Sequence, residues 1–306
     1  MDISIVGTGA VGLSWARAIC DSGLDLRLSL FDPQAPPAGM EWALQQGLPI
    51  HATHDAAPHG EVVLLCTPGG VLPQVLQELL PALESGTCLL DLSTATPADK
   101  ADGASRAAEN GIGYVDAAIT GAVALSGART PLLIAGSSDD RVSGLLESLA
   151  VPVTLLTDSH AGDAVRVKLL RSVITKGIEA LAADMLPVAR DLGLLDQVLS
   201  VFEDIDRKPF TDLLTSMVTT HIAQAGRRGS EMAEAAEQLE RAGADPTLTR
   251  AVAARYGRTV ELTENEPLPQ NFDQALDLLA AARSHAADRI PPHTPNTSDT
   301  KENSPR

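Results

Sequence analysis

The chain has 306 residues, of which 44% are hydrophobic, and it carries a formal net charge of −17. Such a charge opposes binding to nucleic acid or to an anionic membrane surface, and we expect neither partner. The longest apolar segments are interrupted within about ten residues, too soon for the roughly 20 residues that cross a bilayer. Because an apolar strand begins at Ile3, we expect no secretory leader and a cytoplasmic protein, with enough chain for two cores.

The first predicted strand, 3–6, leads directly into a glycine-rich turn and then a helix, with the sequence Gly7-Thr8-Gly9-Ala10-Val11-Gly12 at the turn. In such a turn Gly7 permits the tight bend, Gly9 lets a pyrophosphate approach the backbone, and Gly12 lets the helix pack closely on the strand. The helix N-terminus then faces phosphate. This order of elements predicts a dinucleotide site, with Ala10 and Val11 beside the cofactor. The alternative is a glycine-rich turn that binds nothing.

Asp32 follows the second predicted strand, 26–31, and bears on the choice of cofactor. Its carboxylate can accept hydrogen bonds from the ribose hydroxyls of NAD, whereas the extra phosphate of NADP meets it as a like charge. Residues 33–37 contain no arginine that could hold that phosphate. The sequence therefore favours NAD over NADP.

Short apolar runs then alternate with helical patterns in the first half of the chain, and the second half is helical. The predicted strands are 3–6, 26–31, 62–66, 88–92, 113–116, 132–135 and 151–156. The predicted late helices are 161–192, 195–204, 211–225, 230–242, 247–256 and 272–286. This pattern predicts an α/β Rossmann domain at 1–158, a doubly wound and mostly parallel sheet, followed by an all-α C-terminal domain at 159–288 for substrate binding and dimerisation. The polar tail, 289–306, is expected to be disordered.

Two smaller expectations concern cysteine and metal. Cys20, Cys66 and Cys88 fall in a predicted helix and in apolar strands, and we expect all three to be buried small hydrophobes. No HxxH, HExxH or clustered carboxylate pattern appears on any predicted helix, so we expect no metal site.

Lys168 is the residue whose position suggests acid–base chemistry. It follows a small-residue helix start, stands between apolar neighbours, and shares a helical stripe with Arg171, Ser172 and Thr175. A lysine facing a cofactor cleft can be desolvated, which lowers its pKa and suits it to exchange the proton of a hydroxyl. The alternative is an ammonium that extends to solvent, as on most helices.

Four motifs occur in an order that resembles the β-hydroxyacid dehydrogenases, which are related to 6-phosphogluconate dehydrogenase. They are Gly7-x-Gly9-x-x-Gly12, Asp91-Leu92-Ser93-Thr94, Asp116-Ala117-Ala118-Ile119-Thr120-Gly121-Ala122, and Gly162 followed by Lys168. The resemblance implies an NAD(P)-dependent dehydrogenase, a homodimer, and Lys168 as general acid or base.

The same resemblance implies roles for further residues. Thr120, Gly121 and Ala122 match a segment that holds the substrate carboxylate, while Ser93 and Thr94 match residues beside substrate and nicotinamide. Cys66, Thr67 and Pro68 fall where the loop after a strand meets the cofactor. For two residues a structural role is the alternative, since Thr120 could cap a turn and Asp91 could cap the next loop.

The chain also departs from the pattern of that family. Arg171 and Ser172 stand where the family has an asparagine that orients the substrate, so Ser172 becomes a candidate in its place. A late lysine is missing, and the corresponding stretch begins at His221. There, His221 and Arg228 are candidates to hold an anionic group, whereas an ion pair between Arg227 and Glu231 on a solvated face is the alternative. The chain therefore resembles a divergent branch of the β-hydroxyacid dehydrogenases.

The sequence thus predicts an NAD-dependent oxidoreductase that transfers a hydride between the nicotinamide and the hydroxyl-bearing carbon of a small, acidic substrate. Imine reduction on the same architecture is one alternative, because the asparagine is missing although the lysine is present. A nucleotide-binding protein without redox activity is another. Apolar faces at 173–185 and 213–222 add to the expectation of a homodimer.

Overall fold

The computed structural model describes residues 1–52 and 58–287. The chain divides into two compact units, Met1–Thr175 and the part from Lys176 onward. This division lies inside helix α7 (Asp163–Asp191), later in the chain than the change of sequence pattern at 158–159. The reason is that the start of α7 belongs to the core of the first unit, where Ala164 is buried with Ala118 and Ala135. The tail expected to be disordered, 289–306, lies outside the described residues.

The described part of the first unit contains an eight-stranded sheet with the order β3-β2-β1-β4-β5-β6-β7-β8. The strands are β1 (Asp2–Val6), β2 (Arg27–Phe31), β3 (Ile50–His51), β4 (Val62–Leu65), β5 (Cys88–Asp91), β6 (Gly113–Ile119), β7 (Leu132–Gly136) and β8 (Val153–Leu155). Neighbouring strands are parallel except β6 and β7, which are antiparallel. The predicted Rossmann-type architecture is confirmed, and the short strand β3 is an addition to the predicted set.

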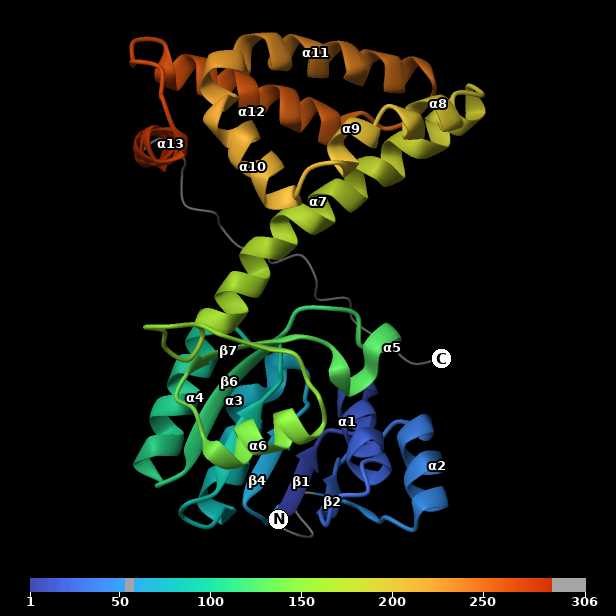
Figure 1. Ribbon diagram of the computed structural model, residues 1–306, viewed down its shortest axis with the longest axis vertical. Helices are drawn as coiled ribbons and strands as arrows, with labels where there is room; N and C mark the ends of the chain where they lie inside the picture. Colours follow the sequence, from blue (N-terminus) through green and yellow to red (C-terminus); the bar gives the residue numbers. More distant parts are fainter. Residues whose placement is uncertain (53–57, 288–306) are drawn as a thin grey trace, which may run out of the picture. The chain divides into compact units, whose positions relative to one another are not determined.

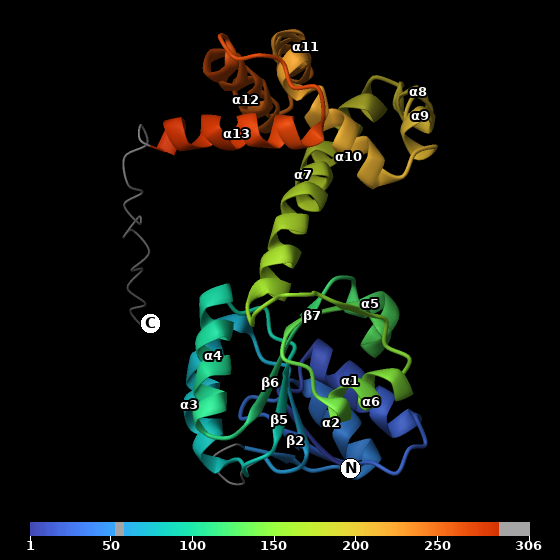
Figure 2. The ribbon, with the colours of Figure 1, turned by 60° about the vertical axis from the view of Figure 1, so that its left-hand side comes forward.

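Helices cover both faces of this sheet (Figure 1, Figure 2). On one side lie α1 (Ala10–Asp21), α2 (Pro37–Gln46) and α6 (Asp140–Ser148), and on the other α3 (Leu72–Leu79) and α4 (Pro97–Glu109). Successive residues of β4 point to opposite faces: Val62 and Leu64 pack with the α1 side, and Val63 and Leu65 with the α3 side. Because both faces are covered, the strand is a continuous apolar run.

The second unit is helical in its described part, as the sequence predicts. After the end of α7 come α8 (Leu195–Ser200), α9 (Glu203–Asp206), α10 (Phe210–Thr219), α11 (His221–Arg241), α12 (Thr247–Thr263) and α13 (Phe272–Ala287). The predicted helix 195–204 is therefore two short helices, and the predicted break at 226–229 is wrong. A Cβ on Gly229 would lie 3.2 Å from Cβ of Tyr256, so this glycine allows α11 and α12 to approach and does not end the helix.

The cysteine expectation is correct at two of the three positions. Cys66 and Cys88 are buried, but Cys20 is exposed. Cys20 lies near the end of α1, where Ile19 faces the core and its neighbour turns away from the sheet. Adjacent helical residues differ by about 100° in direction, which the apolar character of Cys20 does not reveal.

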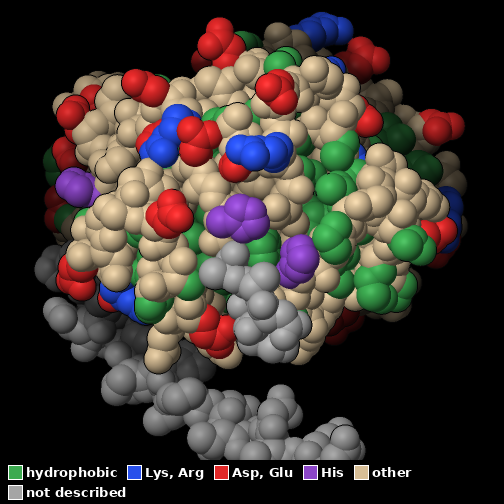
Figure 3. Space-filling model, turned by 90° about the horizontal axis from the view of Figure 1, so that it is seen from below, with side chains coloured by type: hydrophobic (Ala, Val, Ile, Leu, Met, Phe, Trp, Pro, Cys, Tyr) green, Lys and Arg blue, Asp and Glu red, His purple; other side chains and the backbone are tan. Residues whose placement is uncertain are grey.

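Two observations concern the hydropathy and the surface of the described residues. No helix within 1–52 and 58–287 has both the length and the apolar character to cross a membrane. On the face shown in Figure 3, which belongs to the first unit, acidic and basic side chains are interspersed and no broad basic patch is visible.

Candidate functional site

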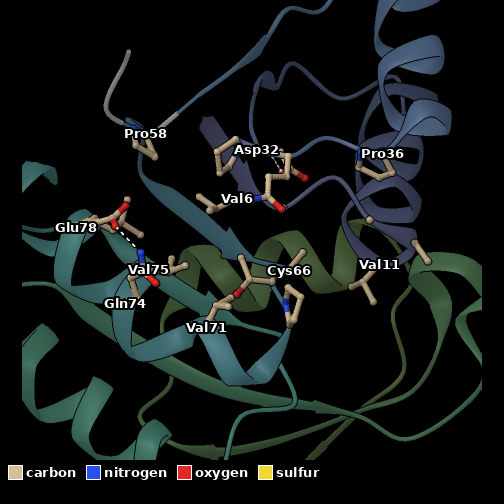
Figure 4. A pocket seen from close by; sticks show the side chains of 18 of the residues that line it. Val6, Val11, Asp32, Pro36, Pro58, Cys66, Val71, Gln74, Val75 and Glu78 are labelled. Carbon is tan, nitrogen blue, oxygen red and sulfur yellow. Dashed lines mark hydrogen bonds between the residues drawn. The ribbon is translucent and has the colours of Figure 1, made fainter. Parts of the chain in front are cut away.

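A cavity of about 640 Å³ lies beside the carboxyl ends of β1 and β4, where the strand order reverses. The loops that follow such strands diverge, which is where doubly wound sheets bind ligands. Figure 4 shows the cavity between the turn after β1, the loop after β4 and the helix α3. It is lined by the following predicted cofactor residues: Gly7, Gly9, Ala10, Val11, Asp32, Cys66, Thr67 and Pro68. Gly12 and Thr94, which are also predicted cofactor residues, are not part of this lining.

The three glycines of the turn differ in what surrounds them. Gly7 has a φ of +96°, and a Cβ there would lie 2.7 Å from the carbonyl oxygen of Cys66. A Cβ on Gly12 would lie 1.9 Å from the carbonyl oxygen of Gly7, whereas a Cβ on Gly9 would meet no described atom within 4 Å. Gly7 and Gly12 are therefore required by the fold itself. Gly9 leaves open space at the cavity, where a phosphate needs close approach to the backbone.

Asp32 is held at the cavity wall by hydrogen bonds to its own carboxylate. The amide and hydroxyl of Thr8 donate to Oδ2 at 2.7 and 2.9 Å, and the amide of Gln34 donates to Oδ1 at 2.9 Å. Carboxylate oxygens can accept more than these bonds, so the group remains able to bind hydroxyls. Glu78, which accepts a hydrogen bond from Gln74, is the other charged residue of the described lining (Figure 4). The described wall is acidic and lacks a cation for an additional phosphate.

The residues present fit a dinucleotide. The amides at the start of α1 face a glycine N-cap that has no side chain to satisfy them, and the hydroxyl of Thr67 is buried without a described partner. Such donors match phosphate and ribose oxygens. The same cavity wall supplies Asp32 for hydroxyl groups.

Lys168 lies near the start of α7, and its amine donates a hydrogen bond to Oγ1 of Thr94 at 3.0 Å. The pKa of Lys168 is lowered from 10.5, first by burial and then by the charge of Lys100. Among the described residues, no carboxylate lies within ion-pair distance of this amine. A Cβ on Gly69 would lie 2.2 Å from the carbonyl oxygen of Thr94, so the loop after β4 packs directly on the loop that carries Thr94. The Lys168–Thr94 pair thus adjoins the loop that lines the cavity.

A buried ionic cluster beneath this pair was missed by the sequence analysis. Lys100 donates to Oδ1 of Asp116 at 2.7 Å and lies 3.4 Å from Oδ2 of Asp91, and all three side chains are fully buried. The hydroxyl of Tyr114 donates to Asp91 at 2.5 Å. Burial, followed by the charge of Asp91, raises the pKa of Tyr114, so its hydroxyl remains neutral. The structural alternative for Asp91 is observed, because its Oδ1 accepts the amide of Ser93 at 2.8 Å in the loop that follows β5.

The remaining first-unit candidates show how the substrate loop is built. The amide and hydroxyl of Thr120 donate to the carbonyl oxygen of Pro131 at 2.9 and 3.0 Å, so this hydroxyl ties the loop to the start of β7. The amides of Gly121 and Ala122 have no acceptor among the described residues. Ser93 is buried, and its hydroxyl has no described partner. Ser172 donates to the carbonyl oxygen of Lys168 within α7.

His221 and Arg228 lie in the second unit, which is described by itself. Nε2 of His221 lies 2.9 Å from Oγ1 of Thr259, and its ring stacks on Tyr256 at 4.9 Å. Burial, followed by the charges of Arg255 and Arg228, lowers the pKa of His221. Arg228 donates to the hydroxyl of Thr220 at 3.0 Å.

Arg227 forms the ion pair with Glu231 that was the alternative to a binding role. Within the described residues, no group of three or more His, Cys, Asp or Glu is placed to hold a metal ion.

Comparison with known proteins places this geometry in a family. Residues 2–156 match the model of the NAD-binding domain of 6-phosphogluconate dehydrogenase. The chain belongs to this family. Residues 189–259 match a second model, a domain of unknown function, DUF1932. This NAD(P)-binding family member therefore carries a helical region of a type without an assigned role.

Relatives of this family member include proteins with and without assigned activities. An uncharacterised 28.5 kDa protein of Methanothermus fervidus is 31% identical over 121 residues, which are 40% of this chain and 46% of the relative. A 2-(hydroxymethyl)glutarate dehydrogenase of Eubacterium barkeri is 27% identical over 177 residues, 54% of this chain and 56% of the relative. The matches thus span about half of each curated relative.

Among solved structures, a variant (V8) of the imine reductase of Myxococcus stipitatus in complex with NAD+ is similar, with a TM-score of 0.70 and 18% identity. The match covers 91% of this chain and 99% of the other. At this level of identity the similarity describes the fold.

Proposed function

We propose that this protein is an NAD-preferring dehydrogenase that oxidises an alcohol on a small anionic substrate, with Lys168 accepting the hydroxyl proton. The observation that carries the proposal is the Lys168 amine, 3.0 Å from the Thr94 hydroxyl and adjoining the loop that lines the dinucleotide cavity. A substrate hydroxyl that takes a position beside Thr94 would lie within reach of this amine.

The chain's own residues supply the binding of the cofactor. The turn at Gly7 and Gly9 and the first amides of α1 would hold the pyrophosphate, and Asp32 would hold the ribose hydroxyls. When bound, the nicotinamide supplies the acceptor for the two electrons removed from the substrate carbon. Asp32 and Glu78 make the described cavity wall acidic, which supports a preference for NAD over NADP.

Lys168 is suited to the proton transfer because its pKa is lowered by burial and by Lys100. A larger fraction of this amine is therefore free of its proton near neutral pH than for a solvated lysine. The unused amides of Gly121 and Ala122 would bind a carboxylate or similar anion. His221 and Arg228 of the second unit remain candidates, from the sequence, for holding an anionic group.

The test is a screen of hydroxy acids with NAD and with NADP, in which turnover is measured by the absorbance of the reduced cofactor. For the substrate that turns over, Lys168→Met is expected to lower kcat about a hundredfold or more while cofactor binding persists. Lys176→Met, on an exposed position of the same helix, serves as the matched control and retains activity. Unchanged turnover in Lys168→Met would exclude the proposed mechanism.

Imine reduction is the second candidate, supported by Arg171 and Ser172 at the place where the resemblance expects an asparagine. A cyclic imine with NADH and NADPH distinguishes it, because the lysine would then give a proton and not take one. If the protein binds NAD and turns over neither class of substrate, the nucleotide-binding alternative without redox activity is favoured.

We also propose a homodimer. Large apolar side chains are exposed on helices of this chain, among them Val173 and Ile178 of α7 and Phe210 and Met217 of α10. Exposed apolar surface of this extent is typical of surfaces that a second subunit covers.

A further inference from the structure

Lys100 is a lysine whose entire side chain is buried, with 0% exposed. An ammonium has three hydrogens to donate, and here each has an acceptor: the carbonyl oxygens of Asp91 and Ala117, both at 3.1 Å, and Oδ1 of Asp116 at 2.7 Å. Lysines are almost never buried to this extent unless they are paired. The amine therefore bridges the carboxyl end of β5 and the middle of the neighbouring strand β6 from its place on α4.

The two carboxylates that face Lys100 each hold a backbone amide beside the proposed catalytic pair. Asp91 accepts the amide of Ser93, the residue before Thr94, at 2.8 Å. Asp116 uses its second oxygen, Oδ2, to accept the amide of Gly162 at 2.7 Å, directly before α7 begins. One continuous set of contacts thus reaches from Lys100 to Thr94 on one side and to the helix of Lys168 on the other.

The start of α7 is also fixed by close packing against the helix that carries Lys100. Gly162 has a φ of +99°, and a Cβ there would lie 2.4 Å from the carbonyl oxygen of Pro97, the first residue of α4. The two helix starts are therefore in direct contact. Movement of the Lys100 cluster would displace Gly162 and, with it, Lys168.

Stability by itself does not explain a charged cluster at this place. Replacing a buried ion pair with well-packed apolar residues is often neutral or stabilising. The charged and titratable groups around Lys100 are Asp91 on β5, Asp116 and Tyr114 on β6, and Lys168 on α7.

We propose that Lys100 is a positioning residue whose buried ammonium joins the end of β5 and the middle of β6 to the start of α7 and so holds the Lys168 amine against Thr94. Its positive charge also disfavours the protonated form of Lys168, which adds to the effect of burial. This inference rests on the proposed function, in which the free amine of Lys168 accepts a proton.

The experiment is trace acetylation of the intact protein with acetic anhydride over a range of pH, read for each lysine by mass spectrometry. The exposed Lys176, in the same samples, is the internal standard for reagent and pH. In Lys100→Met, Lys168 is expected to be acetylated about three- to tenfold more slowly at mildly alkaline pH, because the amine keeps its proton to higher pH. If Lys100 only stabilises the fold and has no effect on the position or charge of Lys168, this rate stays unchanged in the folded variant.

Because Lys100→Met leaves two buried carboxylates without their cation, the double variant Lys100→Met with Asp116→Asn is the second test. The amide oxygen introduced at position 116 can still accept the Gly162 amide, and the variant loses one of the uncompensated charges. We expect slower acetylation of Lys168 here too, with NAD binding retained as the measure of folding. Equal acetylation of Lys168 in the folded variants and the unmodified protein would overturn the inference.

The outcomes for the inference and for the proposed function are separable. If Lys168→Met loses turnover and the acetylation rate does not respond to Lys100, only the role of Lys100 fails. If Lys168→Met keeps turnover, the proposed function fails whatever the acetylation shows.

Discussion

Lys168 has no anionic partner among the described residues, and its described hydrogen-bond acceptor is the hydroxyl of Thr94. Burial and the nearby charge of Lys100 both act against its protonated form. The pH dependence of turnover follows from that direction.

In the oxidative direction the rate is expected to rise with pH as Lys168 loses its proton and to level off below pH 10.5, the ordinary lysine value. In the reductive direction the protonated amine is needed, so the rate falls over the same range. A profile of kcat/KM against pH in both directions measures this. If the change of kcat/KM occurs at the same pH in Lys168→Met as in the unmodified protein, a group other than Lys168 titrates.

Gly9 and Gly12 form a matched pair for testing the dinucleotide site. A Cβ on Gly9 meets no described atom within 4 Å, whereas a Cβ on Gly12 lies 1.9 Å from the Gly7 carbonyl oxygen. Gly9→Ala is therefore expected to keep the melting temperature and weaken NAD binding about tenfold, or about 1.4 kcal/mol. Gly12→Ala is expected to lower the melting temperature itself. Equal NAD affinity in Gly9→Ala and the unmodified protein would place the pyrophosphate elsewhere.

The roles of some individual residues can be predicted from the sequence, and the roles of others cannot. The glycine turn is predictable because its order of strand, turn and helix is local, and Asp32 follows from the same unit. Lys100 is not predictable, since nothing in its neighbours distinguishes it from a surface lysine. Its partners Asp91 and Asp116 meet it only because β5 and β6 are adjacent and α4 covers them.

At the scale of elements, α6 depends on its N-cap. The carboxylate of Asp139 accepts the amides of Arg141 and Val142 at 2.9 and 3.4 Å and pairs with the Arg141 guanidinium at 2.7 Å. Hydrogen bonding to Arg141 lowers the pKa of Asp139 from 3.8 to about 2. The stabilisation is therefore present above pH 3.8 and is lost as the pH falls toward about 2.

Asp139→Ala is expected to lower the free energy of unfolding by about 1 kcal/mol near neutral pH, and by progressively less as Asp139 becomes protonated. Denaturant titrations at several pH values measure both. Asp140→Ala, one residue later and not the cap, is the control. A difference between Asp139→Ala and the unmodified protein that persists below pH 2 would contradict this account.

The direction or length of some elements depends on contacts with other elements, which the local sequence pattern does not show. The connection between β6 and β7 holds the short α5 (Val123–Ser126) and a 3-10 turn at Gly127–Arg129, which are too short to cross the sheet, so β7 returns antiparallel. Gly226 and Gly229 resemble a helix end in the sequence, yet α11 continues through both. In Gly229 the small size serves the contact with Tyr256, which only the packing of α11 on α12 reveals.

At the scale of the whole molecule, the exposed apolar side chains of α7 predict association. Val173 is 68% exposed in the single chain. Light scattering after size-exclusion chromatography is expected to give the mass of a dimer, and Val173→Asp is expected to shift it toward the monomer, because a charge would then be buried. Leu44→Asp, at a position on α2 that is 82% exposed, is the control and should leave the mass unchanged. A monomer mass for the unmodified protein would remove the prediction.

The sequence by itself determined the Rossmann architecture, the glycine turn and the helical second half, because each follows from the order of neighbouring residues and from hydrophobic periodicity. Tertiary structure decided which face of α1 exposes Cys20, and it brought Lys100 to Asp91 and Asp116. It also placed the Lys168 amine against Thr94. Burial and ionic contacts join residues far apart in the chain, and their energies depend on which strands and helices become neighbours.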